Sequence, residues 1–161
     1  MAAMYQPADT PPQPTVNAGR LWAGGAATAV VAALIAIVGV LVGRGLFDVA
    51  VLAPKGAGVW GDASTWWYAL GVALISLVAT GIMHLLLLYT PRPRMFFGWV
   101  MVLGTVVAML APFISDNDLG PRVFTAGLNF LLGVAIGSLI AGSAKAAVRL
   151  VPAQRAPRPY R

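Results

Sequence analysis

The fold is decided by two apolar stretches and the turn between them: Ala69–Tyr89 (ALGVALISLVATGIMHLLLLY), Thr90-Pro91-Arg92-Pro93-Arg94, and Phe96–Ile114 (FFGWVMVLGTVVAMLAPFI). Neither apolar stretch contains Asp, Glu, Lys or Arg. At about 1.5 Å per residue, each is long enough as a helix to cross a hydrocarbon core about 30 Å thick. The two prolines of the turn end one helix before the next begins, and its two arginines favour the cytoplasmic side of a membrane. These stretches therefore predict a membrane-spanning helical hairpin.

The composition predicts a membrane protein for the chain as a whole. Of 161 residues, 59% are hydrophobic and only 10% are charged, which is typical of an integral membrane protein that forms one small bundle. The chain has no cysteine and no glutamate, and all five aspartates lie outside the apolar segments. The formal net charge is +6. Because the basic residues flank the membrane segments or lie near the carboxyl end, we expect no nucleic-acid partner.

Two further apolar segments complete a predicted all-α, four-helix membrane bundle. We expect helices at about 21–43, 69–89, 96–114 and 123–144, within a membrane domain of residues 21–148. Residues 1–20 are proline-rich and are expected to be a disordered tail, because they cannot bury enough apolar surface to offset the entropy of ordering. Residues 149–161 form a basic tail. The first apolar segment is too long for the core of a signal peptide, so we interpret it as an uncleaved helix.

The basic residues are distributed unevenly between the two sides of the predicted bundle. One side carries Arg20, Arg92, Arg94, Lys145, Arg149, Arg155, Arg158 and Arg161, and the other carries Arg44, Lys55 and Arg122. This bias predicts that both termini are cytoplasmic. The expected contacts of Arg92, Arg94, Lys145, Arg149, Arg155 and Arg158 are anionic lipid headgroups or other membrane subunits.

The segment Arg44–Tyr68 is the only long connection. Its apolar run Leu46–Leu52 is too short to cross a membrane. It could lie along the interface, fold back onto the bundle or contact a partner. Trp60 and the trio Trp66-Trp67-Tyr68 are predicted to form an interfacial aromatic belt on this side.

Small residues recur at intervals of four in three of the predicted helices. Such spacing places them on one face, where the backbone of a neighbouring helix can approach closely. The sets are Gly39 with Gly43, Gly104 with Ala108, and Gly133 with Gly137 and Ala141. We expect these faces to pack against other helices, within the bundle or on a partner.

Polar side chains are rare within the apolar segments. Ser76, Thr80 and His84 recur at intervals of four and form one polar stripe. His84 is the only histidine and lies near the cytoplasmic end of its helix, where we expect a structural role. Asn129 differs from His84 in predicted depth by about 13 Å, so the two do not pair, and we expect Asn129 to form a hydrogen bond with another helix.

The residues predict no catalytic, cofactor-binding or metal site. One histidine does not supply the two axial histidines usual for a haem b. The loop Asp116-Asn117-Asp118-Leu119-Gly120 lacks the bidentate glutamate of a calcium site. A Ser/His/Asp set, a phosphate-binding loop and the intramembrane carboxylate of a coupled transporter are all missing. We therefore expect a protein that is not an enzyme.

Two apolar motifs carry a family resemblance: Leu103–Ile114, which contains Met-Leu-Ala-Pro-Phe, and Ala126–Ile136 (AGLNFLLGVAI). The chain from roughly Leu21 to Lys145 resembles an uncharacterised family of small four-helix membrane proteins from actinobacteria. That resemblance implies a location in a bacterial plasma membrane but no particular activity. By architecture, the chain is also similar to the small accessory subunits of actinobacterial respiratory complexes, especially the cytochrome bcc–aa3 assembly.

The favoured hypothesis for function is a non-catalytic accessory subunit of a larger membrane complex, with other integral membrane subunits as its partners. The respiratory cytochrome bcc–aa3 supercomplex is the specific candidate. The alternative is a homo-oligomeric small transporter or channel, with a pathway along Ser76, Thr80 and His84.

Overall fold

The computed structural model describes residues 14–54, 60–62 and 64–150, which form an all-α bundle. Its long helices are α1 (Ala18–Leu46), α2 (Thr65–Tyr89), α3 (Pro93–Leu110) and α4 (Leu119–Ala147), and the 3-10 turn η1 (Ala111–Ile114) extends α3. All four are long and apolar enough to cross a membrane. The number and approximate positions of the predicted spans are confirmed, and the protein is a multi-pass membrane protein.

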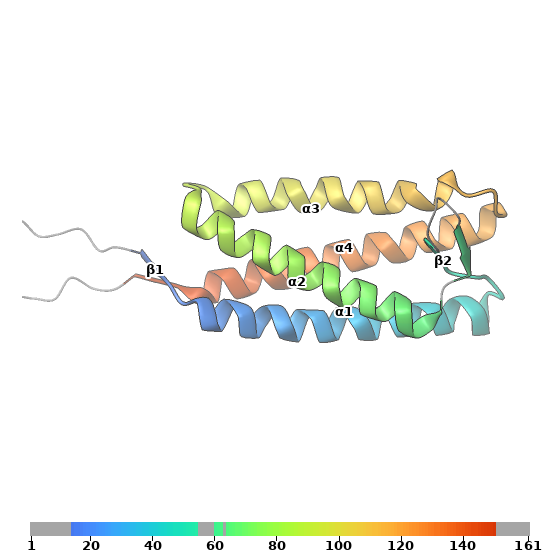
Figure 1. The fold of residues 1–161 in the computed structure, drawn as a ribbon, viewed down its shortest axis with the longest axis horizontal. Helices are drawn as coiled ribbons and strands as arrows, with labels where there is room; N and C mark the ends of the chain where they lie inside the picture. The colour runs from blue at the N-terminus through green and yellow to red at the C-terminus, as the bar shows by residue number, and fades with distance from the viewer. Residues whose placement is uncertain (1–13, 55–59, 63, 151–161) are drawn as a thin grey trace, which may run out of the picture.

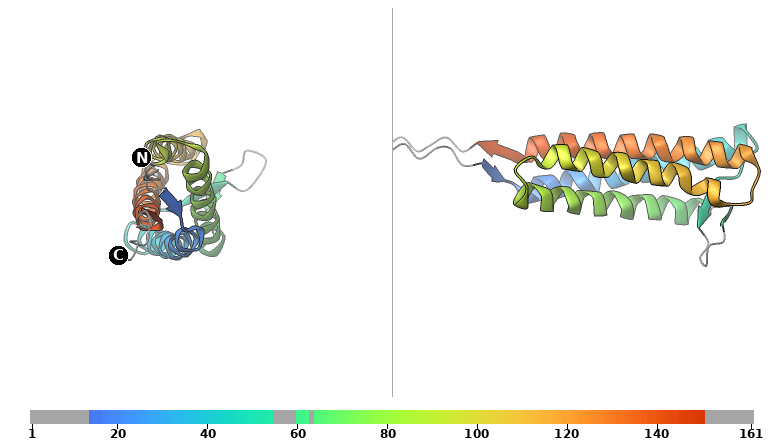
Figure 2. Two further views of the ribbon diagram at one scale, coloured as in Figure 1. Left: turned by 90° about the vertical axis from the view of Figure 1, so that its left-hand side faces the viewer. Right: turned by 90° about the horizontal axis from the view of Figure 1, so that it is seen from above.

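Seen along the bundle axis, the helices lie at the corners of a square, with α4 beside α1 (Figure 2). Helix α2 runs obliquely, so that it begins close to α1 and ends close to α3 (Figure 1). The start of α1, the end of α4 and the turn between α2 and α3 lie at one end, which we call the terminal end. The opposite end carries the connection between α1 and α2 and the loop before α4, and we call it the loop end.

Proline and local hydrogen bonds set the ends of the middle helices. The Thr90 N–H donates to the Leu86 carbonyl and closes α2. Pro93 is the first residue of α3, a position where its fixed φ suits the helix and its missing N–H costs nothing. Pro112 interrupts the hydrogen bonding of α3, which continues only as η1.

The buried face of α1 consists largely of small side chains, whereas α4 buries larger ones such as Leu132 and Ile140, and many other large apolar side chains of the bundle point outward. The buried residues of α1 are Leu21, Gly25, Thr28, Ala29, Ala32, Ala36, Val40 and Gly43. Exposed residues include Leu34, Ile75 and Leu103, at 56%, 63% and 62% exposure. This arrangement suits a bilayer, because lipid tails solvate leucine while small residues let helices approach closely.

The terminal end is held by a short antiparallel ladder, which corrects the expectation of a disordered tail through residue 20. Strand β1 (Pro14–Val16) pairs with β4 (Val148–Leu150). The Asn17 N–H donates to the Ala147 carbonyl, and the Asn17 side chain caps α1 by accepting from the Arg20 N–H. The segment before α1 is thereby joined to the segment after α4. The ladder also satisfies backbone groups that an isolated tail would leave to water. Residues 1–13 and 151–161 lie outside the described residues.

The long connection folds back onto the bundle, which was one of the three open alternatives. Val51 and Leu52 are buried, and the Leu52 N–H donates to the Thr125 hydroxyl at 3.0 Å. Strands β2 (Leu52–Pro54) and β3 (Trp60–Asp62) pair in an antiparallel hairpin. The Val49 N–H donates to the Gly43 carbonyl near the end of α1, so the connection is attached to both α1 and α4.

Helices α1 and α4 extend beyond their predicted ranges at both ends. Helix α1 begins three residues early and ends three residues late, and α4 begins at Leu119 instead of residue 123. The prediction followed the apolar segments, whereas a helix can continue beyond the hydrocarbon core into the interface, where Arg20 and Arg44 are accommodated.

Candidate functional site

Asn129 forms two interhelical hydrogen bonds, more than any other polar side chain described inside the bundle. It lies in the half of α4 that is nearer the loop end. Its Oδ1 accepts a hydrogen bond from the Tyr68 hydroxyl at 2.7 Å. Its Nδ2 donates to the Ala108 carbonyl at 2.7 Å. One amide therefore joins α2, α3 and α4, and it lies far from His84, as the predicted difference in depth implies.

A proline in the sequence explains the hydrogen bond from the Asn129 amide to the Ala108 carbonyl. In a regular α-helix the Ala108 carbonyl would accept from the N–H of residue 112. That residue is Pro112, which has no N–H. The Asn129 amide supplies the missing donor, as neighbouring helices must do for freed backbone groups in a membrane. The two motifs that carry the family resemblance meet at this bond.

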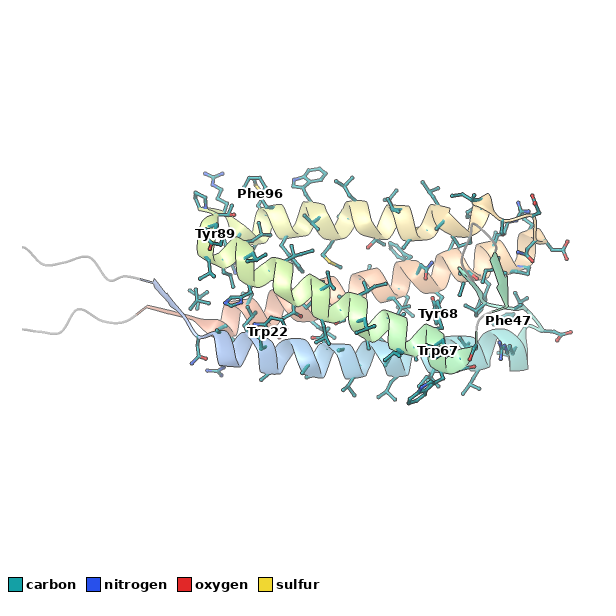
Figure 3. The ribbon with its side chains drawn as sticks, viewed as in Figure 1. Trp22, Phe47, Trp67, Tyr68, Tyr89 and Phe96 are labelled. Atoms are coloured by element: carbon teal, nitrogen blue, oxygen red, sulfur yellow. The ribbon has the colours of Figure 1, made fainter. Side chains whose placement is uncertain are left out.

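The aromatic trio at the start of α2 does not act as one belt, which corrects the sequence-based prediction. Trp66 and Trp67 are exposed, but Tyr68 turns into the bundle to reach Asn129 (Figure 3). Neighbouring residues in a helix are separated by about 100°, so Tyr68 can turn to the bundle while the two tryptophans before it face outward. The side chain of Trp60 lies outside the described residues.

The predicted polar stripe on α2 faces α1. Ser76 and Thr80 are fully buried, and the Thr80 hydroxyl donates to the Ser76 carbonyl at 3.0 Å. The Ser76 hydroxyl has no partner among the described residues. Thr80 packs directly over Gly25, where an added Cβ would lie 2.9 Å from the Thr80 Cβ.

His84 continues this stripe toward the terminal end. Its Nδ1 accepts from the Trp22 indole N–H at 3.3 Å, and the two rings meet edge to face with centroids 6.3 Å apart. Trp22 stands on α1, so the contact joins the terminal halves of α1 and α2 (Figure 3). The indole N–H finds an acceptor here, as Trp usually does when it is partly buried.

Two of the three small-residue sets pack within the bundle. Gly39 lies against Leu128 of α4, and Gly43 lies against Phe124 of α4 and the Val49 carbonyl. Gly133 lies against Thr105 of α3, closely enough that an added Cβ would overlap the threonine side chain. Gly137 faces Met101, 3.6 Å from the position of an added Cβ. Ala141 is partly buried.

The third set, Gly104 with Ala108, does not form a helix interface in the described structure. Gly104 is exposed, and no atom lies within 4 Å of the position that its Cβ would occupy. It lines a cleft of about 280 Å³ between α2 and α3, whose floor includes Asn129 and Gly133 of α4. The oblique course of α2 carries it away from α3 here, so the predicted close approach has no partner helix. We call this space the α2–α3 cleft.

The terminal end carries a second hollow, between the α2–α3 turn and the end of α4. This basic recess has a volume of about 810 Å³ and is lined by Arg92 of the turn, Arg94 of α3 and Lys145 of α4. Its remaining lining is Val16, Leu87, Thr90, Pro91, Pro93, Met95, Ala144 and Val148. Three of the six basic residues predicted to contact lipid or a partner thus surround one hollow. Arg149 lies in β4, and Arg155 and Arg158 lie outside the described residues.

Among residues 14–54, 60–62 and 64–150, no three His, Cys, Asp or Glu side chains lie close enough together to hold a metal ion. Sequence reasoning missed Tyr68 and the Ala108 carbonyl as partners of Asn129. The signal that could have found the carbonyl is Pro112, because any proline within a membrane helix frees the carbonyl four residues before it.

Comparison with known proteins gives one match. No curated protein and no solved structure is similar enough to the chain to count as a match. A family of unknown function, DUF6069, matches residues 16–146, which include all four membrane helices but for the last residue of α4. The chain therefore belongs to this family of unknown function, DUF6069.

Proposed function

We propose that the protein is a non-catalytic accessory subunit of a larger membrane complex, in the plasma membrane of an actinobacterium. The specific candidate for that complex is a respiratory cytochrome bcc–aa3 supercomplex. The observation that carries the proposal is the open α2–α3 cleft with the exposed Gly104 at its edge.

A glycine that faces lipid contributes little to packing against lipid tails. It does allow the backbone of another helix to approach closely, which is the main source of helix association in membranes. At about 280 Å³ the cleft is too small for a helix, whose diameter with side chains is about 10 Å. It has room for one or two apolar side chains from a helix of another subunit lying along α2 and α3.

The incomplete packing of α3 supports the same proposal. Within its described range, Pro93–Leu110, only Phe97 is buried, whereas α1 and α4 each bury eight residues. Exposed side chains such as Trp99, Leu103 and Val107 leave most of the circumference of α3 available to a partner. Such a helix suits the peripheral position of an accessory subunit.

The channel alternative is less well supported by the geometry. Ser76 and Thr80 are buried inside one copy, and Thr80 packs against Gly25 of α1, so a pathway along them does not lie on a surface that a second copy could share. A channel would need the bundle itself to open.

Co-purification of membrane subunits with the tagged protein tests the proposal. We expect the tagged wild-type protein, extracted in mild detergent, to bring down stoichiometric integral membrane subunits. If they form a respiratory complex, the haem absorbance of that complex should accompany them. A homo-oligomer without other subunits would overturn the proposal and favour the channel alternative.

A pair of glycine variants makes the test specific to the cleft. Gly104→Leu should reduce the recovered partners by at least about tenfold, which corresponds to about 1.4 kcal/mol. Gly142→Leu is the matched control, because no atom of the bundle lies within 4 Å of a Cβ at either position. Helical circular dichroism should be unchanged in both variants. Equal recovery of partners with the two variants would exclude the cleft as the contact surface.

The proposal also places both termini in the cytoplasm, because eight of the eleven basic residues belong to the terminal side. Reporter fusions at Arg161 and at Gly58 should report opposite sides of the membrane, with Arg161 inside. An external Arg161 reporter would reverse the orientation.

A further inference from the structure

We infer that the basic recess binds one anionic glycerophospholipid, with the phosphate held by Arg92, Arg94 and Lys145. This inference goes beyond the proposed function and does not depend on a partner complex. It commits to a lipid of the surrounding membrane as the ligand.

The charge of the recess calls for an anion. Arg92 and Arg94 come from the start of α3, as its N-cap and its second residue, and Lys145 comes from the end of α4, so two separate segments bring like charges to one hollow. None of its lining residues is Asp or Glu. Converging cations repel one another unless an anion lies between them, and arginine is well suited to bind phosphate oxygens.

The start of α3 adds to this preference for an anion. Its N-cap, Arg92, makes no side-chain capping hydrogen bond, and the first turn contains no acidic residue. The positive end of the helix dipole is therefore uncompensated beside the two arginines.

The shape and depth of the recess favour a lipid over a soluble phosphate. Leu87, Met95 and Val148 give it an apolar wall, which a phosphate ion would leave uncovered. Tyr89 and Phe96 flank the turn and are exposed, at the level where aromatic side chains mark the membrane interface (Figure 3). A lipid can place its phosphate among the basic residues and the upper part of its acyl chains along the apolar wall. Basic pockets at the ends of transmembrane helices bind anionic headgroups in this way.

Native mass spectrometry of the full-length protein tests the inference. The probes are phosphatidylglycerol and phosphatidylcholine with identical acyl chains, added at equal concentration in detergent. We expect the wild-type protein to retain phosphatidylglycerol preferentially, at one molecule per chain. Equal retention of the two lipids would overturn the inference. So would protection against thermal unfolding by inorganic phosphate equal to that by phosphatidylglycerol.

Two single substitutions separate the recess from general surface charge. Arg92→Gln should weaken phosphatidylglycerol binding by about fivefold, equivalent to about 1 kcal/mol for one basic side chain at an anionic surface. Arg20→Gln is the matched control, since Arg20 is exposed at the same end but does not line the recess. Lys145→Gln provides a second recess variant from a different helix. Equal losses with Arg20→Gln and the recess variants would show that diffuse charge, and not the recess, attracts the lipid.

Discussion

The α1 side and the α3 side of the bundle use similar small-residue patterns with opposite results. On the α1 side, Gly25 is covered by Thr80 and Gly39 by Leu128, so both glycines are needed for the close approach of helices. On the α3 side, Gly104 is open and the α2–α3 cleft lies beside it. Spacing of small residues therefore permits a close approach without determining which helix makes it.

The largest expected effect comes from filling the α1–α2 interface. Gly25→Leu would force a side chain into the space occupied by Thr80, and we expect a destabilisation of about 3 kcal/mol, the upper end of the range for overpacked cores. Unfolding by SDS in mixed micelles, followed by circular dichroism, measures it. Gly104→Leu is the comparison on the α3 side and should leave stability within about 0.5 kcal/mol. Similar losses in both variants would mean that the two sides do not differ in packing.

The next effect tests how α3 is attached to α4. Asn129→Leu leaves the Ala108 carbonyl and the Tyr68 hydroxyl without their partner, and we expect a loss of about 1–2 kcal/mol in the same unfolding assay. In a Pro112→Ala background, residue 112 regains an N–H that can reach the Ala108 carbonyl within α3. The cost of Asn129→Leu should then fall by about half, because one of the two orphaned groups has a new partner. Strictly additive effects would refute the proposed link between Pro112 and Asn129.

A smaller effect is expected for the other half of the same network. Tyr68→Phe removes one interhelical hydrogen bond and keeps the ring, so the loss should be about 0.6 kcal/mol, the average for such bonds in membranes. Combined with Asn129→Leu, it should add almost nothing, since the bond is already absent. A full additional loss in the double variant would show that Tyr68 contributes through another contact.

The smallest effect is expected at His84. His84→Gln removes a bond of 3.3 Å from an indole N–H that is partly exposed, and glutamine also offers an acceptor. Stability should change by less than about 0.5 kcal/mol, and assembly and turnover of any complex should stay close to wild type. A large loss of activity with normal assembly would give the histidine a functional role and support the pathway along the α2 stripe.

The four spans were predictable because a bilayer imposes a single strong rule, a long apolar helix without charges. The side of the bundle that each polar residue occupies was harder to predict. The aromatic pattern predicts an interfacial position for Tyr68 together with Trp66 and Trp67, but the Tyr68 hydroxyl binds Asn129 inside the bundle. The β1–β4 ladder was missed because three-residue strands carry no periodic pattern, and their pairing requires α1 and α4 to bring distant segments together.

The sequence by itself determined the number of membrane helices, the turn at Pro91 and Pro93, and the interruption of α3 at Pro112, because these depend on apolar length and on the missing N–H of proline. Only the tertiary structure decided that Asn129 repairs that interruption, that Gly25 is filled while Gly104 stays open, and that Arg92, Arg94 and Lys145 surround one recess. The difference between Gly25 and Gly104 follows from the oblique course of α2 across the bundle (Figure 1). The angle between two helices arises from the packing of many side chains at once, and no local pattern in the sequence specifies it.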